Sequence, residues 1–399
     1  THCISSAASD VYKRQIQGCI HWLTIGLCIF LLGFLVLPCR QDICCLVKRR
    51  VYLKGIKVIA ALLIVCLALS GCSSRKNLKD LSVVEGLGID SDSNGICLTV
   101  QTLNLVNGGN GTDALSGNIT LNTSAGGQNI SSAAATVSES LSKDLFFGQN
   151  KLLVFGMDVA ENDLSHCFDY LTRSENSRPD VAVCISSGKA AQLLECDQCD
   201  ALVPAQFVAE LIKNGQSSGF SLHVTANEML NLYNDKTSDI CLPVISADDN
   251  GSKTSGIAIF SENRLVGVLK NDEISGLLFL KNRIKSGYMD FESEKYGRIG
   301  VHIITASVKT KAYAQGETVV FKADAKLFFS LEEAENGAKK SFSKAELDEV
   351  VSEVEKAVKR NCEKAFYSCT QQGSDCLRIG ENLAKYDPAA YARLSNEWD

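Results

Sequence analysis

A short apolar run, Ile56 to Leu69, divides the chain into two unlike parts and decides which part can fold as a globular body. A helix rises about 1.5 Å per residue and the hydrocarbon core is about 30 Å thick, so this run is too short to span a bilayer comfortably. Basic residues stand before the run and at its start: Lys48, Arg49, Arg50, Lys54 and Lys57. A positively charged segment followed by a short apolar run is typical of an export signal, which is not part of the mature fold.

The residues that close the run indicate how the body is anchored. Leu69, Ser70 and Gly71 precede Cys72, and together they resemble the lipobox of bacterial lipoproteins. Small residues there let a signal peptidase hold an extended chain, and the cysteine sulfur receives a diacylglycerol. The resemblance implies that Cys72 becomes an N-terminus acylated with palmitate or similar chains, each buried methylene of which contributes about 0.8 kcal/mol to membrane binding. The alternative is a chance cysteine behind an uncleaved anchor helix.

The residues before the signal do not fit an exported protein. Residues 20–37 are apolar and long enough to cross a bilayer, yet an export signal belongs at the true N-terminus. The chain also begins without methionine, so we interpret residues 1–50 as an artefact or as the tail of an upstream reading frame. Translation is then expected to start near Val51, with a signal peptide over residues 51–71 and a lipidated tether over residues 72–82.

The body after Cys72 is acidic. The chain up to Cys72 holds 8 of the 40 basic and 2 of the 46 acidic residues, which leaves the remainder with a net charge of −12. A body of that charge does not seek nucleic acid or an anionic lipid surface by charge alone. We therefore predict no nucleic-acid partner.

Cysteine usage predicts neither a full disulfide framework nor a metal site. Nine of the 17 cysteines follow Cys72, and an odd number cannot all pair within one chain. Cys196 and Cys199 form a CxxC pair, which is half of a zinc site or a redox pair. No second CxxC or nearby histidine completes it in the sequence. The alternative is a reduced or incidental pair, and we predict no metal and no cofactor.

The sequence of the body offers no catalytic constellation. His166, His223 and His302 each stand alone, without a partner at metal-ligand or triad spacing. HExxH, GxxxxGK[ST] and a complete EF-hand loop are absent. The glycines at 109 and 111 are followed by Ala114 where a phosphate-binding loop needs its third glycine. We name no catalytic residue and predict that the protein is not an enzyme.

Strand-like and helix-like segments alternate from residue 83 onward, which predicts an α+β fold of mixed β-sheets with packed helices. Residues 83–90 and 95–106 predict a hairpin around Asn94 and Gly95. The segment 107–129 consists mostly of Gly, Asn, Ser and Thr, so we expect a surface loop. A helix is expected from Ser131. Its apolar face is Ala133, Val137, Leu141 and Leu145.

The alternation continues to a predicted domain boundary near Pro243. Strands are expected at 151–156 and 180–186, each followed by a helix. Two further helices are expected to begin at Pro204 and, capped by Thr225, at Ala226. The polar stretch after Pro243 separates an N-terminal mixed α/β domain, residues 83–248, from a C-terminal α/β region, residues 254–399.

The C-terminal region opens with a hairpin that turns at Glu262 and Asn263, and a helix begins near Asn271. Two long alternating strands and a long amphipathic helix follow. The apolar stripe of that helix either packs on a sheet or meets a partner protein. It consists of Leu347, Val350, Val351, Val354, Ala357, Val358, Cys362 and Phe366.

Several stretches, in this order, resemble one family. Residues 145–178 resemble the strand–helix unit of the Ger(x)C proteins, the C subunits of spore germinant receptors, including an arginine after the leucine-rich helix, here Arg173. Residues 256–282 resemble their second hairpin and helix, and residues 84–90 and 375–399 complete the likeness. The expected positions of the hairpin are occupied by Gly256, Phe260, Leu265, Val266, Gly267 and Leu269.

This resemblance implies a lipoprotein on the outer face of the spore inner membrane, assembled with an A subunit and a multi-spanning B subunit that sense nutrients. It implies a role in spore germination through protein–protein contacts, without enzymatic activity. The chain departs from the family at Gln149, where a Gly-His pair is common, and it stops at Asp399, where a final strand normally follows. The resemblance therefore implies a truncated C-terminal region with an unpaired sheet edge.

Two other functions remain open. A solute-binding lipoprotein of a transporter would share the anchor, but it should have two similar lobes around a ligand cleft, and the body shows no clear repeat of one lobe. An exported enzyme is the third interpretation, and the missing motifs weigh against it.

Overall fold

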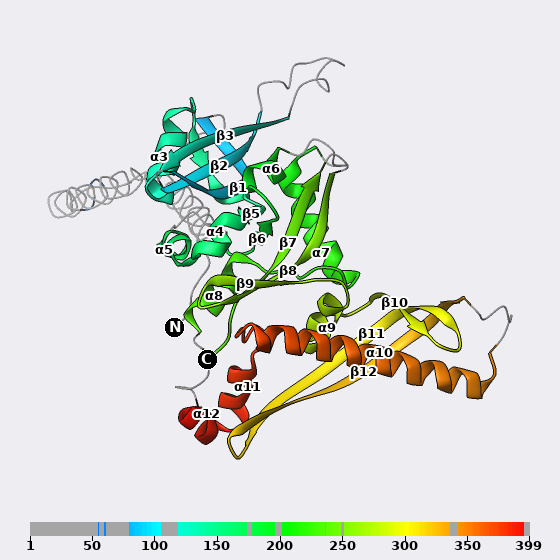
Figure 1. The fold of residues 1–399 in the computed structure, drawn as a ribbon. Helices are drawn as coiled ribbons and strands as arrows, with labels where there is room; N and C mark the ends of the chain where they lie inside the picture. Colours follow the sequence, from blue (N-terminus) through cyan, green and yellow to red (C-terminus); the bar gives the residue numbers. More distant parts are fainter. Residues whose placement is uncertain are drawn as a thin grey trace, which may run out of the picture. The chain divides into compact units, whose positions relative to one another are not determined.

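The chain divides into two compact units, residues 1–75 and residues 76–399. The second unit has a mixed α+β fold of two sheets with packed helices, as the sequence predicts (Figure 1). The computed structural model describes residues 55, 60, 80–93, 95–104, 119–173, 178–195, 202–235, 237–248, 251–335 and 342–394.

The larger sheet has a parallel centre and antiparallel edges. Parallel pairing joins β1 to β5, β5 to β6 and β6 to β7, and a short parallel pairing adds β4 to β1. Antiparallel pairing adds β2 and β3 at one edge and β8 and β9 at the other. The nine strands are β1 (Leu81–Asp92), β2 (Gly95–Leu103), β3 (Thr120–Gly127), β4 (Asp144–Phe146), β5 (Leu152–Phe155), β6 (Ala182–Ser186), β7 (Cys241–Asp248), β8 (Gly251–Ser261) and β9 (Arg264–Leu269).

Helices cover both faces of this sheet, which explains why the central strands β5 and β6 are buried along their whole length. Alternate residues of β5 belong to two different hydrophobic clusters. Leu153 lies in the cluster that includes residues of the helices α3, α5 and α8, whereas Leu152 lies in the cluster that includes residues of α6 and α7. The helical elements of this part are α3 (Ile130–Glu139), η3 (Phe147–Gln149), α4 (Met157–Asn162), α5 (Ser165–Arg173), α6 (Ala190–Leu194), α7 (Pro204–Ser217) and α8 (Ala226–Asn234).

Residues 120–127 differ from the sequence prediction. They were expected within a loop, and that prediction is wrong, because they form the edge strand β3 along the full length of β2. Polar side chains support the pairing: Thr99 Oγ1 lies 2.8 Å from Ser124 Oγ, and Asn122 Nδ2 donates to the Leu194 carbonyl at 2.7 Å. Backbone hydrogen bonds hold an edge strand, so a segment without apolar side chains can still form one. Residues 107–118 lie outside the described residues.

The helix expected from Ser131 ends earlier than its predicted apolar face. Ala133 and Val137 are buried in α3, but the helix ends at Glu139 and Leu145 lies in β4, so the prediction of one continuous face was wrong. Hydroxyl groups of the last turns donate to carbonyls of the helix, from Ser138 to Ala134 and from Ser140 to Thr136. Such back-bonding competes with the backbone ladder, which weakens the end of a helix.

The larger sheet continues across the boundary predicted near Pro243. Pro243 lies within β7 opposite Ile257 of β8, so strands on both sides of the boundary pair with one another. The predicted division therefore falls at a hairpin of one sheet. The next hairpin, between β8 and β9, turns at Glu262 and Asn263 as predicted, and both residues adopt positive φ, 46° and 68°.

The smaller sheet is an antiparallel meander, and the orange helix α10 lies along its yellow strands (Figure 1). A capping box starts α10, because Ser343 Oγ accepts from the N–H of Glu346 while the Glu346 carboxylate accepts from the N–H of Ser343. The elements are α9 (Asp272–Leu280), β10 (Gly287–Ser293), β11 (Gly297–Gln315), β12 (Thr318–Ala334), α10 (Lys344–Gln371), α11 (Ile379–Tyr386) and α12 (Pro388–Leu394).

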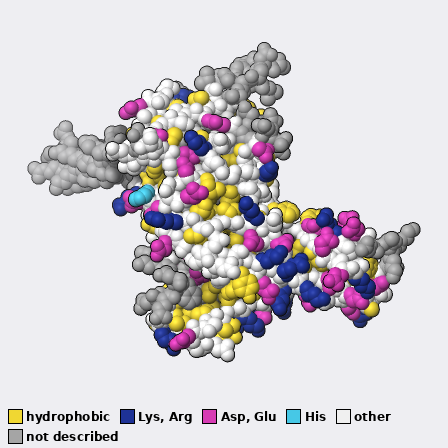
Figure 2. Space-filling model, viewed as in Figure 1, with side chains coloured by type: hydrophobic (Ala, Val, Ile, Leu, Met, Phe, Trp, Pro, Cys, Tyr) yellow, Lys and Arg dark blue, Asp and Glu magenta, His cyan; other side chains and the backbone are white. Residues whose placement is uncertain are grey.

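The apolar stripe of α10 is buried over most of its length. Val350, Val354 and Val358 are buried against the sheet and α9, which confirms packing as the use of this face. Leu347 and Val351 are instead 44% and 41% exposed, so their assignment to the packed stripe was wrong. They lie beside the first turns of the helix, where the capping box rather than a buried side chain fixes the start. Basic and acidic side chains intermingle over the part of the molecule that contains α10 (Figure 2).

Candidate interaction surface

One face of the smaller sheet exposes large apolar side chains. Phe328 is 71% exposed, Tyr288 is 62% exposed and Ile304 is 53% exposed. The Tyr288 ring stacks on His302 of the next strand, with ring centroids 4.6 Å apart. We call these four residues the exposed sheet face. Clustered exposed apolar and aromatic side chains are typical of protein interaction sites.

The strand register explains why these side chains face outward. β10 strictly alternates exposed and buried residues, so Tyr288 points away from the core that holds Met289 and Phe291. Pairing places Tyr288 opposite His302 and Thr305 opposite Phe328. Ile304 follows the buried Ile303 and faces outward by ordinary strand alternation, and a register shift between residues 303 and 305 leaves it without a paired residue on β12.

A cleft of about 1020 Å³ lies where the C-terminal end of α10 meets β12 and the β8–β9 turn. Phe321 of β12 and Phe366 of α10 stack in its wall, with centroids 5.9 Å apart. Hydrophobic side chains gather around α11 on the face shown in Figure 2. Polar and apolar side chains both line the cleft, and its polar residues include the carboxylates of Asp239 and Asp375.

These carboxylates accept hydrogen bonds from backbone N–H groups. Asp239 Oδ2 accepts from the N–H of Asp375 at 2.7 Å, and burial raises the pKa of Asp239. The two carboxylate oxygens of Asp375 accept from the N–H groups of Ile379 and Gly380, each at 2.7 Å, at the start of α11. Their hydrogen bonds identify them as caps of loops and helix ends, so they offer no general acid or base pair.

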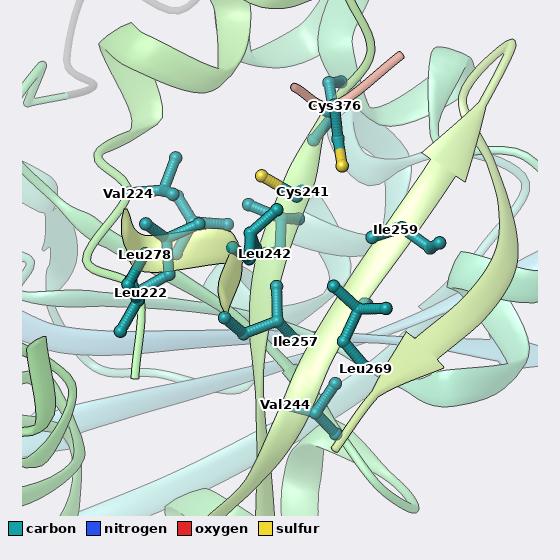
Figure 3. Close-up of a cluster of buried hydrophobic side chains, with 14 of the residues drawn as sticks. Leu222, Val224, Cys241, Leu242, Val244, Ile257, Ile259, Leu269, Leu278 and Cys376 are labelled. Carbon is teal, nitrogen blue, oxygen red and sulfur yellow. The ribbon is translucent and has the colours of Figure 1, made fainter. Parts of the chain in front are cut away.

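Three buried thiols meet beneath the cleft. Cys369 and Cys376 have their sulfur atoms 3.4 Å apart, and the thiol of Cys376 is also hydrogen-bonded to Cys241. Figure 3 shows Cys241 and Cys376 at the edge of the hydrophobic cluster around Leu242 and Ile259. The hydrogen bond to Cys376 and burial raise the pKa of Cys241, which makes this thiol a weak nucleophile. We assign the cluster to packing.

The three histidines that the structure describes do not form a site. Burial lowers the pKa of His223, whose backbone N–H donates to Gln216, while His302 lies on the exposed sheet face and His166 on α5. Among the residues that the structure describes, no group of three or more His, Cys, Asp or Glu side chains could hold a metal ion.

The body also contains one GxSxG match and the first half of a calcium-loop motif. Residues 215–219 match GxSxG, but they lie at the C-terminal end of α7, where the Ser217 hydroxyl donates to the Lys213 carbonyl. A nucleophile elbow needs a strand-to-helix turn, so this match carries no catalytic serine. Residues 90–95 match the first half of a calcium loop, yet Asp90 accepts from the N–H groups of Ala190 and Ala191 instead.

The residues that the sequence assigns to lipid attachment lie outside the described residues. These are Leu69, Ser70, Gly71 and Cys72, and the CxxC pair Cys196 and Cys199 lies outside them as well. Of the helices that the structure describes, none has the length and apolar character needed to cross a membrane. The exposed sheet face was missed from the sequence, although the strict alternation of β10 carries the signal for it.

Comparison with protein families accounts for almost the whole body. Residues 74–247 match the family model described as the spore germination protein N-terminal domain, and residues 255–399 match the model described as spore germination B3/GerAC-like, C-terminal. The chain belongs to the Ger(x)C family of spore germination proteins. The likeness stated from residues 145–178 and 256–282 is thereby confirmed.

Individual relatives agree with this family. The putative spore germination protein YfkR of Bacillus subtilis (strain 168) is 26% identical over 56% of this chain and 60% of its own length. The spore germination protein GerQC of Bacillus cereus is 22% identical over 64% of this chain and 70% of its own length. The crystal structure of the GerBC protein has a TM-score of 0.50 at 17% identity, covering 78% of this chain and 91% of that one. This last likeness shows the Ger(x)C fold.

Proposed function

We propose that the protein is the lipid-anchored C subunit of a nutrient germinant receptor and acts in spore germination through contacts with A and B subunits. The observation that carries the proposal is the order of features along the chain: residues 69–72 resemble a lipobox, and two residues later the first of two spore germination domains begins. A subunit held by acyl chains on Cys72 stays on its membrane without a spanning helix. We place it on the outer face of the spore inner membrane.

The exposed sheet face supports a role in protein–protein contact. Its aromatic and aliphatic side chains, Tyr288, Ile304 and Phe328, are of the kinds that anchor interfaces. We assign this face to the contact with a receptor subunit that presents an apolar surface. The alternative, a solute-binding lipoprotein of a transporter, receives less support, because the described residues form one large mixed sheet and one small meander rather than two similar lobes.

A pull-down from spore inner membrane tests the anchor and the receptor assignment together. Wild type and Cys72→Ala are compared, and both fractions are identified by mass spectrometry. We expect A- and B-type subunits with the wild type, and loss of the Cys72→Ala protein from the membrane. Recovery of transporter permeases in place of receptor subunits would favour the solute-binding alternative.

A second variant locates the contact. Phe328→Ser with Tyr288→Ser removes the two most exposed rings of the face without touching the buried core. We expect the protein to remain folded and membrane-bound while recovery of the receptor subunits falls at least tenfold, since loss of an interface anchor weakens binding by about 2 kcal/mol or more. Tyr367→Ser, which removes a 58% exposed ring from α10, is the matched control. Equal recovery with all variants would refute this assignment of the face.

A further inference from the structure

A second hollow, about 270 Å³ in volume, lies between the C-terminal end of α9, the helix α11 and β11. Its volume is near the lower limit of small-molecule sites, which hold roughly 300–1,000 Å³, so a ligand for it must be compact. We call it the basic pocket, after the charged side chains that line it: Lys281, Arg283, Arg378, Lys385, Glu228 and Glu381.

The fold places these cations with little freedom. At the end of α9 the N–H of Arg283 bonds to the Leu278 carbonyl and the N–H of Asn282 to the Phe279 carbonyl, which is a Schellman motif with Asn282 at its left-handed position, φ 53°. This motif fixes the backbone of Arg283 and of Lys281 before it. The other side of the pocket is one face of α11, because Glu381 and Lys385 are four residues apart.

The charges of the basic pocket do not balance. Arg283 pairs with Glu228, and Arg378 pairs with Glu381 at 3.0 Å. The other two cations have no carboxylate at ion-pair distance among the described residues. Lys281 Nζ donates to the Cys376 carbonyl at 2.6 Å and is also hydrogen-bonded to the Cys241 thiol, while Lys385 Nζ lies 5.3 Å from the ring centroid of Tyr386. Four cations and two carboxylates leave two net positive charges, although the chain as a whole has a net charge of −6.

The backbone conformation of Arg378 is an independent observation in favour of a binding site at the pocket. Its backbone is left-handed, with φ 63° and ψ 39°, at the N-cap of α11. Glycine adopts this conformation without strain, whereas an arginine does not. Its ion pair with Glu381 is nearly half exposed on both sides, so it contributes little to stability. A strained backbone that carries an arginine into a hollow is typical of a binding site.

We propose that the basic pocket binds a small dianionic oxyanion, such as a phosphate group or a dicarboxylate. The Arg378 guanidinium would supply a planar fork for two oxygens, and the ammonium groups of Lys281 and Lys385 would neutralise the second charge. Thr310 also lines the pocket and its hydroxyl is a donor for a remaining oxygen, as is the second N–H of the Asn382 amide, whose Nδ2 donates to the Arg378 carbonyl at 2.8 Å. The proposal concerns this pocket alone and is independent of the receptor assignment.

Calorimetric titration of the purified protein tests the proposal. Inorganic phosphate and succinate are the two dianionic probes, and acetate and chloride at equal ionic strength are the monovalent comparisons. We expect saturable binding of at least one dianion and none of the monovalent ions, and the two dianion titrations distinguish phosphate from dicarboxylate. Lys385→Gln should weaken the binding at least about tenfold, because a charge-assisted hydrogen bond is lost. Lys359→Gln, which removes a cation from the exposed face of α10, should bind as the wild type does.

Arg378→Gly separates binding from folding. Glycine relieves the left-handed backbone, so the melting temperature should equal or exceed that of the wild type, while dianion affinity falls at least about tenfold. The proposal is overturned if the wild type binds neither dianion, or if Lys359→Gln weakens binding as much as Lys385→Gln does. It is also overturned if Arg378→Gly binds the dianion as tightly as the wild type.

Discussion

At the scale of single residues, Asp90 shows how one side chain joins segments that are far apart in sequence. The residue is 3% exposed, and its carboxylate accepts from the N–H of Ala190 at 2.6 Å and of Ala191 at 3.1 Å. These N–H groups open α6 and have no partner within that helix. These two hydrogen bonds join β1 to the start of α6 and partly offset the cost of burying the Asp90 carboxylate.

Replacing Asp90 should weaken the fold. We expect Asp90→Asn to lower the free energy of unfolding by about 1–3 kcal/mol, because the amide has one acceptor oxygen where the two oxygens of Asp90 each accept a backbone hydrogen bond. Urea denaturation followed by circular dichroism measures this difference. Asp324→Asn on the exposed part of β12 is the control, and a similar loss in both variants would contradict the role of Asp90 as a cap.

The same residue gives a prediction for pH. Burial raises the pKa of Asp90 above its ordinary value of 3.8, so the folded state holds this proton more tightly than the unfolded state does. Protonated Asp90 therefore contributes to the stability of the fold. This contribution is fully present below the pKa that Asp90 has in the unfolded state and is lost as the pH rises through its pKa in the folded state. The destabilisation caused by Asp90→Asn should therefore be larger at pH 4 than at pH 7. An equal or smaller loss at pH 4 would contradict this sign.

Cysteine labelling is a further residue-scale prediction. Burial raises the pKa of Cys167 to about 12 and, together with the hydrogen bond to Cys376, raises that of Cys241. Cys97 is only partly buried. Among the described cysteines, iodoacetamide at pH 8 should therefore label Cys97 first and reach Cys167 and Cys241 only after unfolding, because the thiolate is the reactive form. Peptide mapping by mass spectrometry reads the order, and early labelling of Cys241 would contradict the buried thiol cluster.

At the scale of elements, the close approach of the α9 backbone to the α10 backbone at Gly276 decides how these two helices cross. A Cβ placed on Gly276 of α9 would lie 2.0 Å from the Asn361 carbonyl oxygen and 3.0 Å from the Ala365 Cβ of α10. The two helices are also joined by a hydrogen bond from Asn361 Nδ2 to Ser275 Oγ, 3.1 Å long. The crossing therefore depends on a glycine, since the helix backbone of α10 cannot give way as a flexible side chain would.

Gly276→Ala should force these helices apart. We expect a loss of about 1–3 kcal/mol or more in the free energy of unfolding, which is the usual effect of overpacking a core. Thermal and urea denaturation measure the loss. Gly300→Ala in β11 is the matched control, because a Cβ there would lie 3.6 Å from Glu333 Cβ, an ordinary contact. Comparable stability of both variants would show that the crossing tolerates a larger side chain.

At the scale of the whole molecule, the two family domains share one structure. The sheet passes from β7 to β8 through the position where the domain models meet. The segment between α10 and α11 also returns to that sheet, because Ser374 Oγ donates to the Phe260 carbonyl at 2.6 Å and the N–H of Asp375 donates to Asp239. Contacts of this kind couple the stability of the two halves.

Unfolding of residues 76–399 should consequently be cooperative. We expect one transition in urea, with coincident curves from far-ultraviolet circular dichroism and from tyrosine fluorescence, since the larger sheet contains strands of both halves. Two separate transitions would show that the predicted boundary between residues 248 and 254 divides independent folding units. Equilibrium denaturation at several protein concentrations provides the control for association.

The sequence by itself determined the local elements and the family. The apolar runs that become β5 and β6, the Thr225 cap of α8 and the turn at Glu262 were readable because each depends on neighbouring residues. The tertiary structure alone decided the edge strand β3, the early end of α3, the exposed positions of Leu347 and Val351, and the basic pocket. The edge strand β3 and the basic pocket depend on groups from distant segments, such as Lys281 and Lys385 beside one hollow. Periodicity reports which face of an element is apolar, but what that face meets is set by long-range packing.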